Sequence, residues 1–278
     1  MQSSATHDGH PVDAIIDLSH LGHLKISGPD AKKFLQGQLT CNMEDISINQ
    51  CRVGAHCNPK GRIISLFNIF YFKESFYLQM PRDMISLASN ALKKYAVFFK
   101  VSLLDVSDEF HCVGYMGNSL GSFPLPQNPH EVTLFNDLLI FKVPDHSPRY
   151  ELLGDIKAIT EFKNLVPNAE NLSIDYWKYR DIEAKIPNVY PETSEKFLPH
   201  ELNLHLNNGI SFNKGCYTGQ EIIARIQYRG QLKTRLETMF IESNIPFERG
   251  MDLPAISCMV VDSCKKNLDQ YILLCLTS

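Results

Sequence analysis

The sequence has little that would mark a secreted, membrane or nucleic-acid-binding protein. Its eight cysteines are scattered without a CxxC pair, as in compartments where thiols stay reduced, so no disulfides are expected. Lys and Arg number 27 against 31 Asp and Glu, and this net charge of −4 provides no global basic surface for a phosphate backbone. The densest apolar stretch, residues 63–72, is shorter than the about 20 residues of a membrane-spanning helix. We therefore expect neither membrane contact nor direct nucleic-acid binding.

The N-terminal residues lack the features of targeting segments. The stretch MQSSATHDGHPVDAIIDL has no basic segment followed by an apolar core, and its acidic residues and lack of Arg do not fit a mitochondrial presequence. We expect a cytoplasmic, bacterial protein rather than one of the mitochondrial matrix, and a monomer. No structural metal is expected, because neither His20-x-x-His23 nor His56-Cys57 has the paired spacing of a zinc site.

Strands and helices recur along the chain in two similar rounds. Residues 52–81 predict a three-stranded meander, and residues 82–100 have the apolar period of a helix. Strand-like segments return within residues 101–154. Because successive strands are joined by turns rather than by crossover helices, this order predicts an α+β fold and not a doubly wound parallel sheet. Residues 236–278 read as short strands that are too few to fold alone.

The stretch KGCYTGQEIIARIQYRG, residues 214–230, contains a single cysteine before a helical pattern. Thr218 followed by Glu221 is a capping-box pattern, which predicts a helix that begins at Thr218. Cys216 would then lie just outside the N-terminus of this helix. The positive end of the helix dipole and the cation of Lys214 would favour the thiolate of Cys216.

The residues alone leave the role of Cys216 open. A cysteine in a glycine-flanked turn is commonly a small buried side chain. A nucleophile would need a base, and no histidine falls within residues 214–230, although His200 and His205 precede them closely enough to fold back. A metal site would need more ligands than the segment offers.

The longer stretch NNGISFNKGCYTGQEIIARIQYRG, residues 207–230, closely resembles the signature of the YgfZ family. These are folate-binding proteins related to the glycine-cleavage T protein, an aminomethyltransferase, and implicated in iron–sulfur cluster maintenance. The similarity extends, in the same order, to ISGPDAKKFLQGQLTCNM (26–43), GAHCNPKGRIISLF (54–67), LKKYAVFFKV (92–101) and WKYRDIEAKIP (177–187). It implies a T-protein-like α+β fold of ferredoxin-like subdomains around a central folate pocket, with a small and incomplete C-terminal β-barrel.

The resemblance also implies domains, a cofactor and partners. Residues 1–235 would form the folate-binding domain, with subdomains of about 1–100 and 101–235, and residues 236–278 the barrel segment. The cofactor would be tetrahydrofolate or a one-carbon derivative, and the partners iron–sulfur enzymes, including tRNA-modifying ones, or cluster-assembly proteins. Cys216 would be the essential thiol with Lys214 beside it, and the rest of the motif would be Gly215, Tyr217, Thr218, Gly219, Gln220 and Glu221.

Four further residues are expected to bind the folate. A pterin offers a flat ring for stacking and an amino-amidine edge that suits one carboxylate, and the glutamate tail requires cations. Trp177, the only tryptophan, can stack, and Glu183 matches the pterin-contacting carboxylate position of the relatives. Arg225 and Arg229 are the expected cationic contacts. Without the resemblance, Trp177 reads as a core anchor and Glu183 as a solvated residue.

One departure from the T-protein pattern bears on the reaction. Aminomethyltransferases carry an aspartate just after the turn equivalent to Lys60-Gly61, whereas this chain has Ser65 and Leu66 there. The leading hypothesis is therefore a folate-binding accessory factor for iron–sulfur proteins. The alternatives are a folate-dependent transferase of aminomethyl or methyl groups and an interaction scaffold with vestigial folate binding.

Overall fold

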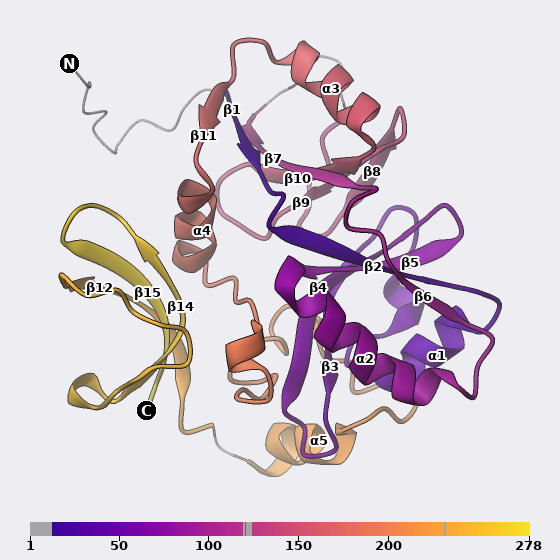
Figure 1. The fold of residues 1–278 in the computed structure, drawn as a ribbon. Helices are drawn as coiled ribbons and strands as arrows, with labels where there is room; N and C mark the ends of the chain where they lie inside the picture. The colour runs from indigo at the N-terminus through magenta and orange to yellow at the C-terminus, as the bar shows by residue number, and fades with distance from the viewer. Residues whose placement is uncertain (1–12, 119, 121–123, 231) are drawn as a thin grey trace.

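The described residues form three sheets with helices packed on them (Figure 1). The computed structural model describes residues 13–118, 120, 124–230 and 232–278. Residues 1–12, the greater part of the N-terminal stretch on which the targeting expectation depends, lie outside the described residues. Within those described ranges, no helix is long and apolar enough to cross a membrane.

The first sheet has five antiparallel strands in the order β3-β4-β5-β2-β6. Its strands are β2 (Leu21–Ser27), β3 (Arg52–Cys57), β4 (Ile63–Phe72), β5 (Ser75–Pro81) and β6 (Ser102–Asp105). Helices α1 (Ala31–Gln38) and α2 (Ile85–Ala96) pack on it, and α2 buries Ile85, Ala88 and Leu92 at helical spacing. The meander and the helix predicted for residues 52–100 are confirmed.

The second sheet has six strands in the order β11-β1-β7-β10-β9-β8. They are β1 (Asp13–Asp17), β7 (His111–Gly117), β8 (Val132–Phe135), β9 (Leu138–Lys142), β10 (Arg149–Gly154) and β11 (Glu170–Leu172), and α3 (Ile156–Leu165) covers one face. The first strand of the described residues thus belongs to the second sheet, because β1 pairs with β7 and β11.

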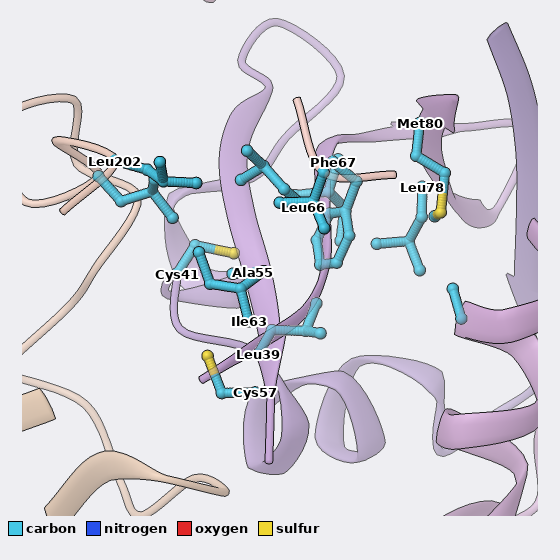
Figure 2. Packing of buried hydrophobic residues seen from close by; sticks show 14 of the residues in the cluster. Leu39, Cys41, Ala55, Cys57, Ile63, Leu66, Phe67, Leu78, Met80 and Leu202 are labelled. Atoms are coloured by element: carbon cyan, nitrogen blue, oxygen red, sulfur yellow. The ribbon is translucent and has the colours of Figure 1, made fainter. Parts of the chain in front are cut away.

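The two large sheets pack face to face through apolar side chains. Alternate side chains of a strand point to the same face, so Phe70 and Phe72 of β4 lie on one face. This face is turned toward the second sheet, because both side chains join its residues in one buried cluster. Phe70 stacks on Tyr77 of β5 with ring centroids 5.4 Å apart, and both join Ile16 of β1 in one buried cluster. A second buried cluster includes residues of β3, β4 and β5. Figure 2 shows part of it, together with Leu202 from the segment after α4.

Two helices and a long irregular segment connect the large sheets to the third sheet. Helix α4 spans Ile174–Glu183, and α5 spans Gln220–Arg229. The third sheet has the order β12-β15-β14-β13, with β12 (Arg235–Glu242), β13 (Asp252–Leu253), β14 (Cys258–Lys265) and β15 (Gln270–Thr277). It curls as a half-barrel against α4 (Figure 1). The predicted α+β fold with a small, incomplete C-terminal barrel is confirmed.

Candidate functional site: a cavity between the sheets and an exposed cysteine turn

A cavity lies between the two large sheets, beside α4 and the segment that follows it. It encloses about 860 Å³, including the space at its open mouth. Leu66 and Phe67 of β4 form an apolar wall, and Leu202 and Leu204 extend this wall from the segment before α5. Polar groups come from β4, β5, β10 and α4, so the cavity combines apolar walls with a few convergent polar side chains, as small-molecule sites do.

Glu151 of β10 is the most deeply buried acid of the cavity wall, with 7% of its surface exposed. Gln79 of β5 donates a hydrogen bond from Nε2 to Glu151 Oε2 at 2.9 Å, which links the two sheets. Asn68 Nδ2 in turn lies 3.5 Å from Gln79 Oε1. Burial, together with the charge of Asp181, raises the pKa of Glu151 to about 8. The carboxyl group is therefore mostly protonated at pH 7.

Trp177 of α4 is fixed on the cavity wall by close contacts with Gly114 and Arg149. A Cβ atom added to Gly114 would lie 2.5 Å from Trp177 Cζ3, so the indole requires a glycine there. The Arg149 guanidinium lies 4.6 Å from the ring centroid, a cation–π contact. Only 2% of Trp177 is exposed, and that part contributes to the cavity wall. These contacts hold the indole in one position on the cavity wall.

Asp181 lies one helical turn after Trp177 and also lines the cavity. Arg149 Nη1 donates to Asp181 Oδ1 at 2.8 Å, and Arg149 Nε donates to Asp145 at 2.6 Å. Burial raises the pKa of Asp181 to about 6, although the Arg149 charge opposes the shift. Asp181 is thus mostly ionised at pH 7, and its charge is matched by a guanidinium behind the wall.

Two histidines complete the titratable groups of the wall. Burial lowers the pKa of His20, in the turn between β1 and β2, to about 4, and nearby Lys178 adds to the shift. Burial likewise lowers the pKa of His130 to about 4. Both imidazoles are neutral at pH 7 and can offer one donor and one acceptor each.

Glu183 does not line the cavity, in contrast to its expected role. It is the last residue of α4, is exposed, and forms an ion pair with Arg180. Six residues after Trp177, it lies about 240° further around the helix, on another face. The structure instead brings Trp177 together with Glu151 and Asp181. The sequence signals for these acids were a polar residue inside the apolar strand RYELLG and a carboxylate four residues after Trp177.

The motif helix begins later than the capping box predicted. Helix α5 starts at Gln220, and its N-cap is Gly219 in the left-handed region at φ 84°. Thr218 does not cap it: its backbone N–H donates to the Gly37 carbonyl, and its hydroxyl lies 3.3 Å from Gln38 Oε1. A side chain at Gly219 would collide with the Asn58 carbonyl, at 2.6 Å from an added Cβ. This close approach to the turn before β4 explains both the glycine and the later start.

Lys214 points into the protein rather than toward the cysteine. Its Nζ donates to the Leu39 carbonyl at 2.8 Å and the Cys41 carbonyl at 2.7 Å, and lies 5.0 Å from the centroid of the Tyr217 ring. Burial lowers the pKa of Lys214 to about 8. These contacts direct the charge of Lys214 to backbone carbonyls, whereas we expected it to stabilise a Cys216 thiolate. Lys214 and the buried Tyr217 instead hold the turn against the end of α1.

Cys216 is exposed, whereas the other seven cysteines are buried. The neighbouring Gly215 has open space around its Cα, with no heavy atom within 4 Å of an added Cβ. No residue of the 212–230 segment lines the cavity, so Cys216 is not part of the cavity wall.

The arginines of α5 are also on the surface. Arg225 pairs with Glu221 one turn before it, at 2.9 Å, with both side chains exposed. Arg229 is exposed in the last turn of the same helix. Neither arginine contributes to the cavity wall. The motif and the cavity are therefore two separate features of the chain.

Comparisons with known proteins agree with this architecture. Residues 12–119 match the GCVT N-terminal domain family. The solved structure of glycine cleavage system aminomethyltransferase T from Bartonella henselae matches with a TM-score of 0.74 at 15% identity, over 96% of this chain and 78% of that chain. At this identity, the likeness establishes the fold alone.

Relatives with higher identity establish the family. The protein named "tRNA-modifying protein YgfZ" of Colwellia psychrerythraea is 32% identical over 86% of this chain and 75% of the relative. Its namesake from Vibrio atlanticus is 34% identical over 81% of this chain and 71% of the relative. The chain carries the KGCYTGQE turn, the T-protein-like fold and this identity over most of its length, and it belongs to the YgfZ family.

Proposed function

We propose that this protein binds tetrahydrofolate or a one-carbon derivative in the cavity between the two large sheets. In its folate-bound form, the protein supports iron–sulfur enzymes, including enzymes that modify tRNA. Cys216 is the thiol that acts on the partner. The relatives' name, tRNA-modifying protein, supports the link to tRNA modification.

The observation that carries the folate proposal is the pairing of Trp177 with Glu151 on one cavity wall. A pterin needs an aromatic or apolar surface for its ring and a carboxyl group for its amino-amidine edge. Trp177 supplies the first, and Glu151 supplies the second. Asn68 and Gln79 add amide groups that can meet the remaining polar atoms of the ring. In this assignment Glu151 takes the role that the resemblance implied for Glu183.

The wall near Leu66 favours an accessory role over aminomethyl transfer. The cavity wall that β4 provides consists of Leu66, Phe67 and Asn68 and has no carboxylate. Ser65 is buried and lies outside this wall. A transferred aminomethyl group would need a nearby acid or base to manage its proton.

The proposal for Cys216 depends on its accessibility. A thiol on an anchored but exposed turn can meet a protein-bound cluster or sulfur group without a change of fold. Because the turn is separate from the cavity, folate binding and thiol action are expected to be separable by mutation. Cys216→Ser should leave folate affinity unchanged while it abolishes support of iron–sulfur enzymes in cells that lack the native protein.

The folate proposal is tested by titration with 5-formyltetrahydrofolate, a stable reduced folate. Trp177 is the only tryptophan, so its fluorescence reports on the cavity directly. Glu151→Gln should weaken binding by about 10- to 100-fold, because a charge-assisted hydrogen-bond pair is lost. Glu183→Gln is the matched control and should bind as the wild type does. Absence of any fluorescence or calorimetric response at millimolar ligand would reject the folate site.

A further inference from the structure

The cavity wall has an unusual balance of charge for a ligand that ends in carboxylates. Its titratable residues are Glu151, Asp181, His20 and His130, and no Lys or Arg is among the described residues that line it. Glu151 is protonated and both histidines are neutral at pH 7, for the reasons given above. Asp181 therefore supplies the only full charge of the wall, and this charge is negative.

Two cations close to the wall contact other groups. Arg149 is fully buried behind Trp177 and pairs with Asp145 and Asp181. Arg52 donates to the Cys51 carbonyl. Neither contributes to the wall, so neither can form a direct ion pair with a ligand inside the cavity.

A carboxylate inside this cavity would lose its hydration without a counter-ion. Burial of an unpaired charge is strongly unfavourable, and Asp181, already paired with Arg149, offers such a carboxylate no compensation. A glutamate tail is consequently expected to stay in solvent beyond the mouth. Lys178, half-buried near His20, is a cation that such a tail can approach. Ion pairs at exposed positions change affinity by at most about fivefold.

We propose that the cavity selects the neutral, donor-rich headgroup of a reduced pterin and does not read the glutamate tail. This inference rests on the proposed folate site. It predicts that folates carrying no glutamate, one glutamate and several glutamates bind with similar affinity. The state of polyglutamylation, which changes the charge of the tail but not the pterin, would not control occupancy of this protein.

The test compares three ligands that share the headgroup and the p-aminobenzoyl ring: 5-formyltetrahydropteroate, 5-formyltetrahydrofolate and its triglutamate. Titration of Trp177 fluorescence in the full-length protein should give dissociation constants that agree within fivefold. A steady change of more than fivefold with the number of glutamates would overturn the inference while leaving the folate site intact. No response to any of the three ligands would instead contradict the folate site itself.

A charge introduced at the rim provides the positive control. Asn207 lines the cavity and is exposed, so Asn207→Arg places a cation where a tail leaves the cavity. This variant should bind the triglutamate more tightly than the pteroate, and the preference should weaken as salt is added. The wild type should bind the three ligands with equal affinity, and Asn207→Arg should show a graded preference. This pair of results would show that the native cavity itself is insensitive to the glutamate tail.

Discussion

The protonated Glu151 makes ligand binding dependent on pH in a direction that can be calculated. The amino-amidine edge of a pterin presents two donors, so it pairs with the carboxylate and not with the acid. Glu151 must therefore release its proton when the ligand binds. For a pKa of about 8 in the free protein, about one carboxyl group in eleven is ionised at pH 7 and about ten in eleven at pH 9.

The expected result is an affinity for 5-formyltetrahydrofolate that rises about tenfold from pH 7 to pH 9. Isothermal titration calorimetry measures both the affinity and the number of protons released on binding. At pH 7, buffers of different ionisation enthalpy should report the release of about 0.9 proton for each ligand bound. Asp181, with a pKa of about 6, is already ionised over this range and contributes little to the change.

Two variants separate Glu151 from other sources of pH dependence. Glu151→Gln keeps the size of the side chain but cannot ionise, so its weaker binding should not change between pH 7 and pH 9. Glu183→Gln alters an exposed acid outside the cavity and should retain the tenfold rise. An affinity that is flat or falls with pH in the wild type would refute the carboxylate pairing.

Four further predictions concern stability and the thiol. Gly114→Ala should destabilise the fold by about 1–3 kcal/mol in urea unfolding and shift the emission of Trp177, because the added methyl group collides with the indole. Gly215→Ala, with open space around it, should change stability by less than about 0.5 kcal/mol. His23 is fully buried and its pKa is lowered by burial to about 4, so unfolding takes up a proton below about pH 6.5 and stability falls as the pH drops toward 4. His23→Leu should reduce the loss between pH 7 and pH 5 by about 2 kcal/mol, and an unchanged loss would contradict this origin. Iodoacetamide should add one group to the native protein, at Cys216, and eight after denaturation, as counted by mass spectrometry. More than one adduct in the native protein would contradict the burial of the other thiols.

Local patterns in the sequence were sufficient for most of the elements. Turn signals on either side of a β-rich run identified the meander of residues 52–81, and helical spacing identified α2. The pairing of β1 with the second sheet was not accessible in this way, because periodicity describes a strand but not its neighbour. The start of α5 was displaced for a similar reason: the contact of Gly219 with Asn58 is tertiary and overrides the local capping signal.

The site shows the same division between local and tertiary information. Trp177 was identified as a candidate because it is the only tryptophan and lies in a segment that resembles the family, and the structure places it on the cavity wall. Its acidic partner could not be read from α4, because Glu151 comes from a strand of the second sheet and its bond to Gln79 spans both sheets. The direction of Lys214 was equally hidden, since its carbonyl partners lie near residue 40.

The most direct test of pterin binding at Glu151 is a crystal structure of the protein with 5-formyltetrahydrofolate bound. Density for the pterin should lie in the cavity, with its amino-amidine edge within 3.2 Å, about the limit of a hydrogen bond, of the Glu151 carboxylate and its ring beside Trp177. The glutamate should extend toward solvent. A pterin bound at Glu183 or along α5, or a saturated crystal with an empty cavity, would contradict the account.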